Sequence, residues 1–190
     1  MAKANSHDLS SPSDWVVRWA HLVPEHGAVL DLACGQGRHA RYLAAKGHPV
    51  LACDRDPLAL DSLAGVQGVK TLLADLEGGA PWPFPGRSFA GIIVVNYLHR
   101  PLFRIIAESL MPGGVLIYET FLAGNERYGK PSNPEFLLKR DELLDAFGSD
   151  MSVAGYEQGL VFRPKPALIQ RLCAVRGSGL ENDLEPRDRP

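Results

Sequence analysis

The sequence predicts an α/β fold of three layers, in which helices cover both faces of a doubly wound, mostly parallel sheet of seven strands. The first observation is an alternation, between residues 29 and 121, of short apolar runs with amphipathic stretches at helical spacing. The second is a pair of apolar runs near the end, residues 152–157 and 169–176, joined by a turn that contains glycine and proline. This pair predicts an antiparallel strand at one edge of the sheet.

Local signals support each element. Ser13 or Asp14 is expected to cap a first helix over residues 15–22, because short polar side chains accept hydrogen bonds from the free amides of a helix start. Gly47 suits the end of one helix, and Pro57 suits the first turn of the next. The expected parallel strands are residues 29–33, 50–54, 69–74, 90–96 and 115–121, and the later helices are expected at residues 38–46, 57–64, 102–110 and 140–147.

Length and composition indicate one globular domain. The chain has 190 residues, of which 45% are hydrophobic and 22% charged, so it can bury a core without cross-links. We expect a flexible segment at residues 1–13, a single domain over residues 14–176 and a disordered tail at residues 177–190. No segment has the apolar character of a signal sequence or a membrane span, so a cytoplasmic location is expected.

Charge and cysteine content limit the expected partners and cofactors. The net charge of -2 gives no strong nucleic-acid signal. The cysteines, Cys34, Cys53 and Cys173, form no CxxC pair and the histidines are dispersed, so no metal site is expected. No feature indicates a membrane partner, and a monomer and a homodimer both stay open.

Polar residues close the expected parallel strands. Ligands of an open α/β sheet bind beyond the carboxyl ends of its strands, near the point where the strand order reverses. A turn or a helix cap could explain any one of these residues, but packing alone does not require all five. They are Asp31, Asp54, Asp75, Asn96 and Glu119.

A glycine turn follows the first of these strands. Gly35 and Gly37 allow a ligand to approach the backbone closely, and the helix start behind them favours negative charge. With Ala40 the pattern fits the relaxed dinucleotide fingerprint, so a nicotinamide or flavin cofactor and a plain structural turn both stay open at this point. Asp31 would repel a pyrophosphate over the turn and attract a cation, which favours a ligand with an ammonium group.

The next two acids suit a nucleoside. Asp54 lies where an acid accepts hydrogen bonds from ribose hydroxyls, although a capping role before Pro57 is the alternative. Asp75 could accept a hydrogen bond from an exocyclic amine while Leu76 packs on the ring. The Asp54 carboxylate is compatible with either a dinucleotide or an ammonium-bearing nucleoside.

Taken in order, five motifs resemble those of class I S-adenosylmethionine-dependent methyltransferases, which have a Rossmann-like fold. The motifs are VLDLACGQG, ACDRDP, LLADLEG, FAGIIVVNYLHR and LMPGGVLIYETF. The resemblance runs from residue 29 to 121 and more loosely to 176. The whole chain is most similar to small bacterial methyltransferases of the tellurite-resistance and thiopurine-like type. The resemblance implies S-adenosyl-L-methionine as cofactor and a small-molecule acceptor, methylated by in-line displacement.

The resemblance also implies a role for each matching residue. The glycine turn would surround the methionine part of the cofactor, and Asp54 would hold both ribose hydroxyls. Asp75 and Leu76 would contact the adenine, and Asn96 would face the transferred methyl group. Ala33 stands where the family often has glycine, which limits close backbone approach at that position. The implied cofactor-binding residues are Asp31, Ala33, Gly35, Gly37, Asp54, Asp75, Leu76 and Asn96.

Candidates for the acceptor side follow the fourth and fifth strands. His99 could act as a base near neutral pH, Glu119 closes the fifth strand, and Tyr128 could form a pocket wall. Arg127 could bind an anionic substrate. The irregular segment 122–136 is long for a plain connector and is interpreted as a functional lid.

Three other functions stay open from the sequence. The acceptor could be RNA or protein, which a basic surface beside the pocket would favour. An NAD-type oxidoreductase is a second class, opposed by the charge of Asp31. A non-catalytic protein that kept the fold and bound the cofactor is a third.

Overall fold

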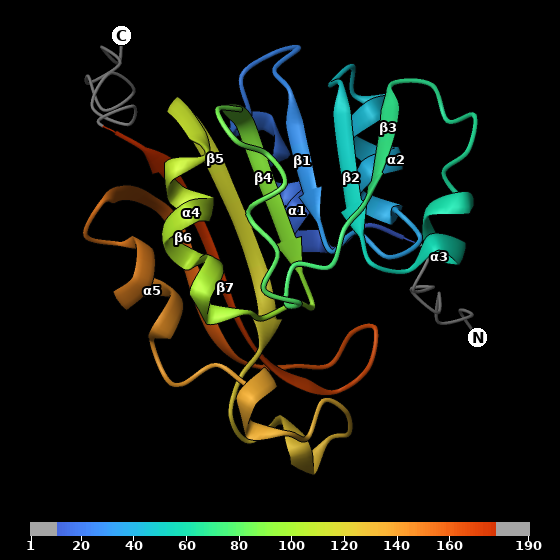
Figure 1. Ribbon diagram of the computed structural model, residues 1–190. Helices are drawn as coiled ribbons and strands as arrows, with labels where there is room; N and C mark the ends of the chain where they lie inside the picture. Colours follow the sequence, from blue (N-terminus) through green and yellow to red (C-terminus); the bar gives the residue numbers. More distant parts are fainter. Residues whose placement is uncertain (1–10, 178–190) are drawn as a thin grey trace, which may run out of the picture.

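Seven strands form one sheet in the order β3-β2-β1-β4-β5-β7-β6, and helices lie on both of its faces (Figure 1). The computed structural model describes residues 11–177, so the expectations for residues 1–10 and 178–190 lie outside it. The strands are β1 (Val29–Leu32), β2 (Val50–Asp54), β3 (Val69–Leu73), β4 (Phe89–Val95), β5 (Leu110–Phe121), β6 (Met151–Val161) and β7 (Ala167–Arg176). The predicted three-layer, mostly parallel architecture is confirmed.

Two separate cores explain why the parallel strands are apolar on both faces. Helices α1, α2 and α3 cover one face through residues such as Trp15, Leu43 and Leu60. Helices α4 and α5 cover the other face through Ile106 and Phe147. The helices are α1 (Asp14–Trp19), α2 (Arg38–Ala45), α3 (Pro57–Asp61), α4 (Phe103–Glu108) and α5 (Glu142–Phe147), with 3-10 turns η1 (Ala20–Leu22), η2 (Arg100–Leu102), η3 (Asn125–Arg127) and η4 (Pro134–Phe136).

The strand order reverses between β1 and β4. The chain runs outward from β1 to β2 and β3, and then returns to place β4 on the other side of β1. All pairings among these strands and β5 are parallel, so their carboxyl ends meet at one edge. The space beyond this edge is where ligands bind in open α/β sheets.

The reversed strand is β7, and it lies between β5 and the outermost strand β6. It is antiparallel to both neighbours. Pairing of Phe121 with Ile169 and of Val161 with Ala167 brings the β6–β7 turn, residues 162–166, to the carboxyl end of β5. Residues far apart in the sequence therefore meet at the same edge as the switch point.

The fifth strand begins earlier than the sequence indicates. The pairing of β4 with β5 shifts from Phe89 with Leu110 to Gly91 with Val115, so the Pro-Gly-Gly segment forms an irregularity inside the strand and not a turn before it. A Cβ at Gly114 would lie 2.8 Å from the carbonyl oxygen of Phe89, which explains why glycine stands there. The other predicted elements are present with shifted ends.

Candidate functional site

The two strands at the switch point both end in a non-glycine residue with left-handed backbone. Ala33 follows β1 with φ of 53°, and Asn96 follows β4 with φ of 59°. Such a conformation costs roughly 1–2 kcal/mol in a residue with a Cβ. Local strain of this kind concentrates at functional sites, and both residues line the same two cavities.

The two glycines of the turn after β1 have different surroundings. The amide of Gly35 donates to Oδ2 of Asp54 at 2.7 Å, which ties the turn to β2. A Cβ at Gly35 would meet no atom within 4 Å, so this side of the turn faces open space. Gly37 has φ of 74°, and a Cβ there would lie 2.4 Å from the Leu63 side chain, so the backbone conformation and the packing both favour glycine. The space beside Gly35 fits the close approach expected of a cofactor.

Asp31 lies beneath this turn and not in its opening. Its carboxyl is 1% exposed, and Oδ2 accepts a hydrogen bond from the amide of Ala40 at 2.9 Å. Burial raises the pKa of Asp31 to about 7, against the opposing effect of that hydrogen bond. The side chain anchors the first turn of α2. Its predicted attraction of a bound cation would therefore act over a distance, without direct contact between the carboxylate and the ligand.

Asp54 borders a cavity of about 230 Å³ at the end of β2, which we call the Asp54 pocket. Its oxygens accept from the amides of Gly35, at 2.7 Å, and Asp56, at 3.0 Å. Each carboxylate oxygen has a second acceptor position, so the pair suits two neighbouring hydroxyl groups. Asp75 and Leu76 line the same pocket, which brings the three predicted nucleoside contacts together.

Tyr97 adds an unpartnered group to the Asp54 pocket. Among residues 11–177 its hydroxyl is buried without a hydrogen-bond partner. Burial, followed by the negative charge of Glu77, raises the pKa of Tyr97, so the group stays a neutral donor. A buried hydroxyl rarely stays unpaired, and the neighbouring carboxylate in this pocket is that of Glu77. The sequence offers Tyr97, after the fourth strand, as a candidate for the acceptor side, whereas it lines the Asp54 pocket.

Asn96 connects three cavities into one crevice. It lines the Asp54 pocket, a second cavity of about 460 Å³ beside Gly35 and Gln36, and a third of about 90 Å³ beside Glu119. We call the last two the glycine-turn pocket and the Glu119 pocket. Arg38 is shared between them. The Asp54 pocket and the Glu119 pocket are therefore neighbours that share Asn96 in their lining.

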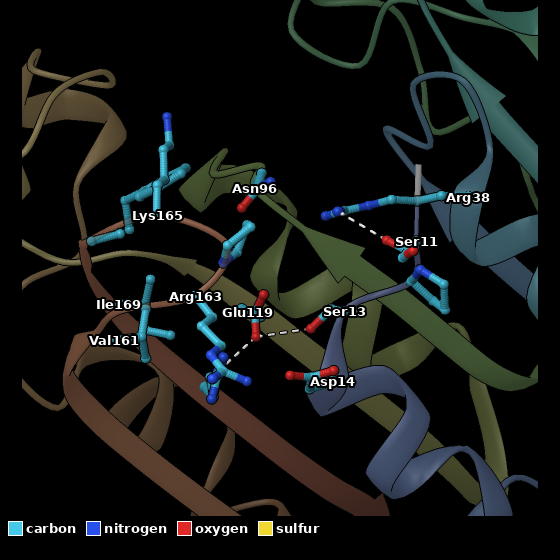
Figure 2. Close-up of a pocket in the computed structure, with 15 residues that line it drawn as sticks. Ser11, Ser13, Asp14, Arg38, Asn96, Glu119, Val161, Arg163, Lys165 and Ile169 are labelled. Carbon is cyan, nitrogen blue, oxygen red and sulfur yellow. Dashed lines mark hydrogen bonds and ion pairs between the residues drawn. The ribbon is translucent and has the colours of Figure 1, made fainter. Parts of the chain in front are cut away.

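Glu119 is held by two donors at the Glu119 pocket (Figure 2). Its Oε2 accepts from the hydroxyl of Ser13 at 3.0 Å and from Nε of Arg171 at 2.6 Å. The residue is 8% exposed. Because one oxygen takes both donors, this carboxylate is fixed in place and acts first as an anchor of the pocket wall.

The N-terminal residues form the opposite wall. Ser13 donates its amide to Nε2 of His39 at 3.2 Å, and the carbonyl of Ser11 accepts from Arg38 at 3.2 Å. Burial lowers the pKa of His39 to about 3, so the ring is neutral and Nε2 can accept. The expected flexible segment thus includes residues that are bonded to the domain. Apart from the helix cap at Ser13, no sequence signal indicated this wall.

His99 and Tyr128 lie outside the crevice. Within residues 11–177 neither lines the three pockets just described. Tyr128 follows η3 and is 41% exposed, and Nε of Arg127 donates to the carbonyl of Gly124 at 3.2 Å. Of the predicted acceptor-side residues, the structure brings Glu119 alone to the crevice.

Metal-binding groups and membrane-spanning helices are both lacking among the described residues. Residues 11–177 contain no group of three or more His, Cys, Asp or Glu side chains that could hold a metal ion. None of the helices in that range is long and apolar enough to cross a membrane.

Comparison with known proteins gives a family match over part of the chain. Residues 29–114 match the family model described as "Methyltransferase domain". A search of the curated proteins found no significant match. The family match covers β1 to the start of β5, including the glycine turn, Asp54, Asp75 and Asn96.

Solved structures share the fold. TehB from Haemophilus influenzae superposes with a TM-score of 0.74 at 18% identity, over 87% of this chain and 63% of that one. A TehB-like SAM-dependent methyltransferase from Corynebacterium glutamicum gives 0.62 at 19% identity, over 86% and 87%. An S-adenosylmethionine-dependent methyltransferase from Mesorhizobium loti gives 0.65 at 18%, over 84% and 96%. This chain spans less than two thirds of the Haemophilus protein, and at these identities the likeness shows the fold.

Proposed function

Because the chain carries a methyltransferase domain with the fold of S-adenosylmethionine-dependent enzymes, we propose that it methylates a small molecule bound in the Glu119 pocket. One observation supports this most directly: Asn96 borders both the Asp54 pocket and the Glu119 pocket. Methyl transfer needs two molecules held end to end with a short gap, and the crevice offers two adjoining spaces.

The residues of the Asp54 pocket and the glycine turn suit S-adenosyl-L-methionine. Asp54 offers two carboxylate oxygens to the ribose hydroxyls, and Asp75 offers an acceptor to the adenine amine. Leu76 and Tyr97 supply apolar surface beside them, and Gly35 leaves its side of the turn open. When bound, this cofactor supplies a sulfonium methyl group already activated for displacement. The chain's own task is then positioning and the exclusion of water.

The size of the Glu119 pocket supports a small acceptor. One water-sized group takes roughly 10–15 Å³ on this measure, so about 90 Å³ accommodates only a handful of such groups. An RNA or a protein could place at most one side group there. Within this pocket Glu119 is a positioning residue, since Arg171 and Ser13 already hold Oε2. We propose no catalytic role for His99 or Tyr128.

Calorimetric titration and a turnover assay test the proposal. We expect micromolar or tighter binding of S-adenosylhomocysteine and no comparable binding of NADH. Methyl transfer from labelled S-adenosylmethionine to a panel of small thiols, amines and phenols should then identify an acceptor. Binding of NADH in place of S-adenosylhomocysteine would contradict the methyltransferase assignment. Cofactor binding without transfer to any small acceptor, together with transfer to RNA or protein, would contradict the acceptor class.

A further inference from the structure

The lining of the Glu119 pocket is unusually basic for this chain. Its polar lining includes four basic side chains and two acidic ones, whereas the chain as a whole has a net charge of -2. The acids are Asp14 and Glu119, and the basic residues are Arg38, Arg163, Lys165 and Arg171. The positive excess is therefore local, and it lies beside the residue that connects the pocket to the rest of the crevice.

One of the four cations is already neutralised. Arg171 donates to Glu119 at 2.6 Å and to Glu157 at 3.4 Å, and its guanidinium lies 5.7 Å from the ring centre of Trp15. Its side chain is 17% exposed, so this ion pair is largely shielded from water. Arg171 thus organises the wall, and Arg163 and Lys165 are the basic lining residues for which the described part of the chain supplies no partner.

The β6–β7 turn provides this positive charge from the side of the pocket opposite Arg38 (Figure 2). Arg38 is the first residue of α2 and bonds the carbonyl of Ser11. Burial lowers its pKa, which shows that its charge is partly removed from water. Arg163 and Lys165 lie in the turn, and within residues 11–177 neither has a hydrogen bond or an ion pair.

The remaining lining is apolar. Phe121 ends β5, Val161 ends β6, and Ala167 and Ile169 begin β7. Ala167 and Ile169 are each 6% exposed, so they form a dry floor below the charged rim. A molecule that suits both parts has an apolar body and one anionic group, because a free cation near low-dielectric surface gains most from a paired anion.

We propose that the Glu119 pocket takes an acceptor with a carboxylate on a compact apolar body, held by Arg163 and Lys165. This inference rests on the proposed function, because the bound molecule is a methyl acceptor only if the chain is a methyltransferase. The preference for a carboxylate is a property of the pocket itself. The sequence assigned anion binding to Arg127, which does not line the pocket. We assign it instead to the β6–β7 turn, which the strand pairing brings to the pocket.

Benzoate and benzamide form a matched pair of probes, since they share shape and differ in charge. We expect titration of the full chain with benzoate to give a dissociation constant at least tenfold lower than with benzamide. The measurement is made with and without saturating S-adenosylhomocysteine. The Arg163→Gln and Lys165→Gln variants should each weaken benzoate binding two- to fivefold, and their combination about tenfold, with no change for benzamide.

Arg127→Gln is the control, since it removes the same charge from a nearby segment outside the pocket. The Arg127→Gln variant should leave both dissociation constants unchanged. Raising the salt to roughly 300 mM, where exposed charges are screened, should likewise leave the dissociation constant of benzamide unchanged. Equal binding of the two probes, or a benzoate preference that persists in the double variant, would overturn the inference. Failure to bind S-adenosylhomocysteine would instead overturn the proposed function, and the titration without it still decides the charge preference.

Discussion

Replacement of Asp54 by alanine tests the centre of the proposed cofactor site. In the structure this carboxylate accepts hydrogen bonds from two backbone amides, those of Gly35 and Asp56, and borders the Asp54 pocket. The substitution therefore removes two contacts with the protein and the two acceptor positions offered to a ribose. These effects have separate measurable consequences, on stability and on binding.

The loss of binding follows from the second effect. Hydrogen bonds to a charged group contribute about 1.5–3 kcal/mol, and two hydroxyls would share this carboxylate in the proposed complex. Part of this is offset because water replaces the missing acceptor in the half-buried pocket. We expect S-adenosylhomocysteine to bind more weakly by about 2–3 kcal/mol, which is roughly 30- to 150-fold in the dissociation constant.

Asp56→Ala is the matched control. Asp56 is two residues away and carries the same charge, but its carboxylate caps α3 by accepting from the amide of Leu58 at 2.9 Å. Removing the cap should lower the free energy of unfolding by about 1 kcal/mol without changing the affinity. Titration calorimetry and denaturant unfolding of both variants separate the outcomes. Unchanged affinity in folded Asp54→Ala would mean that the ribose is not bound by Asp54.

Three other substitutions test the turn, the buried acid and the pocket wall. Gly35→Val should abolish S-adenosylhomocysteine binding in titration, because the added side chain fills the open side of the turn; full binding would contradict that placement. The folded pKa of Asp31 lies above the ordinary 3.8, so its contribution to stability is present below about pH 4 and is lost as pH rises through about 7. Asp31→Asn should therefore gain stability relative to the parent between pH 4 and pH 8, by at most about 4 kcal/mol in urea unfolding, and a constant difference would contradict the raised pKa. Glu119→Gln removes the closer partner of Arg171, which keeps only its 3.4 Å contact with Glu157, and should lower the free energy of unfolding by about 2–3 kcal/mol, less than for a fully buried pair; a neutral effect would show that the ion pair is solvated.

The sequence predicted which strand-end residues line the Asp54 pocket because its signals are local. A polar residue after a buried parallel strand lies at the carboxyl edge whatever the rest of the chain does. Asp54, Asp75 and Asn96 reach the crevice for this reason, and the fold class follows from the same alternation. Asp31 was predicted at the right strand end, but the sequence did not show that its side chain points to the amide of Ala40.

The acceptor end was not predictable in the same way. Arg163 and Lys165 reach the pocket only through the register of β6 with β7 and of β7 with β5, which no local pattern specifies. His99 and Tyr128 were predicted as acceptor-side residues because of their chemistry and their place after a strand. Among the described residues, neither lines the crevice. Long-range pairing decides which polar residues after a strand become lining residues.

The position of Ser13 has a practical consequence for anyone who shortens this chain. Its amide, hydroxyl and carbonyl contact His39, Glu119 and the amide of Val17, so one residue joins α2, β5 and α1. A truncation that starts at residue 14, the domain limit read from the sequence, would delete this junction together with a wall of the acceptor pocket. A shortened protein could therefore bind the proposed cofactor yet show no methyl transfer to any acceptor. Such a result would reflect the truncation and not the activity of the intact chain.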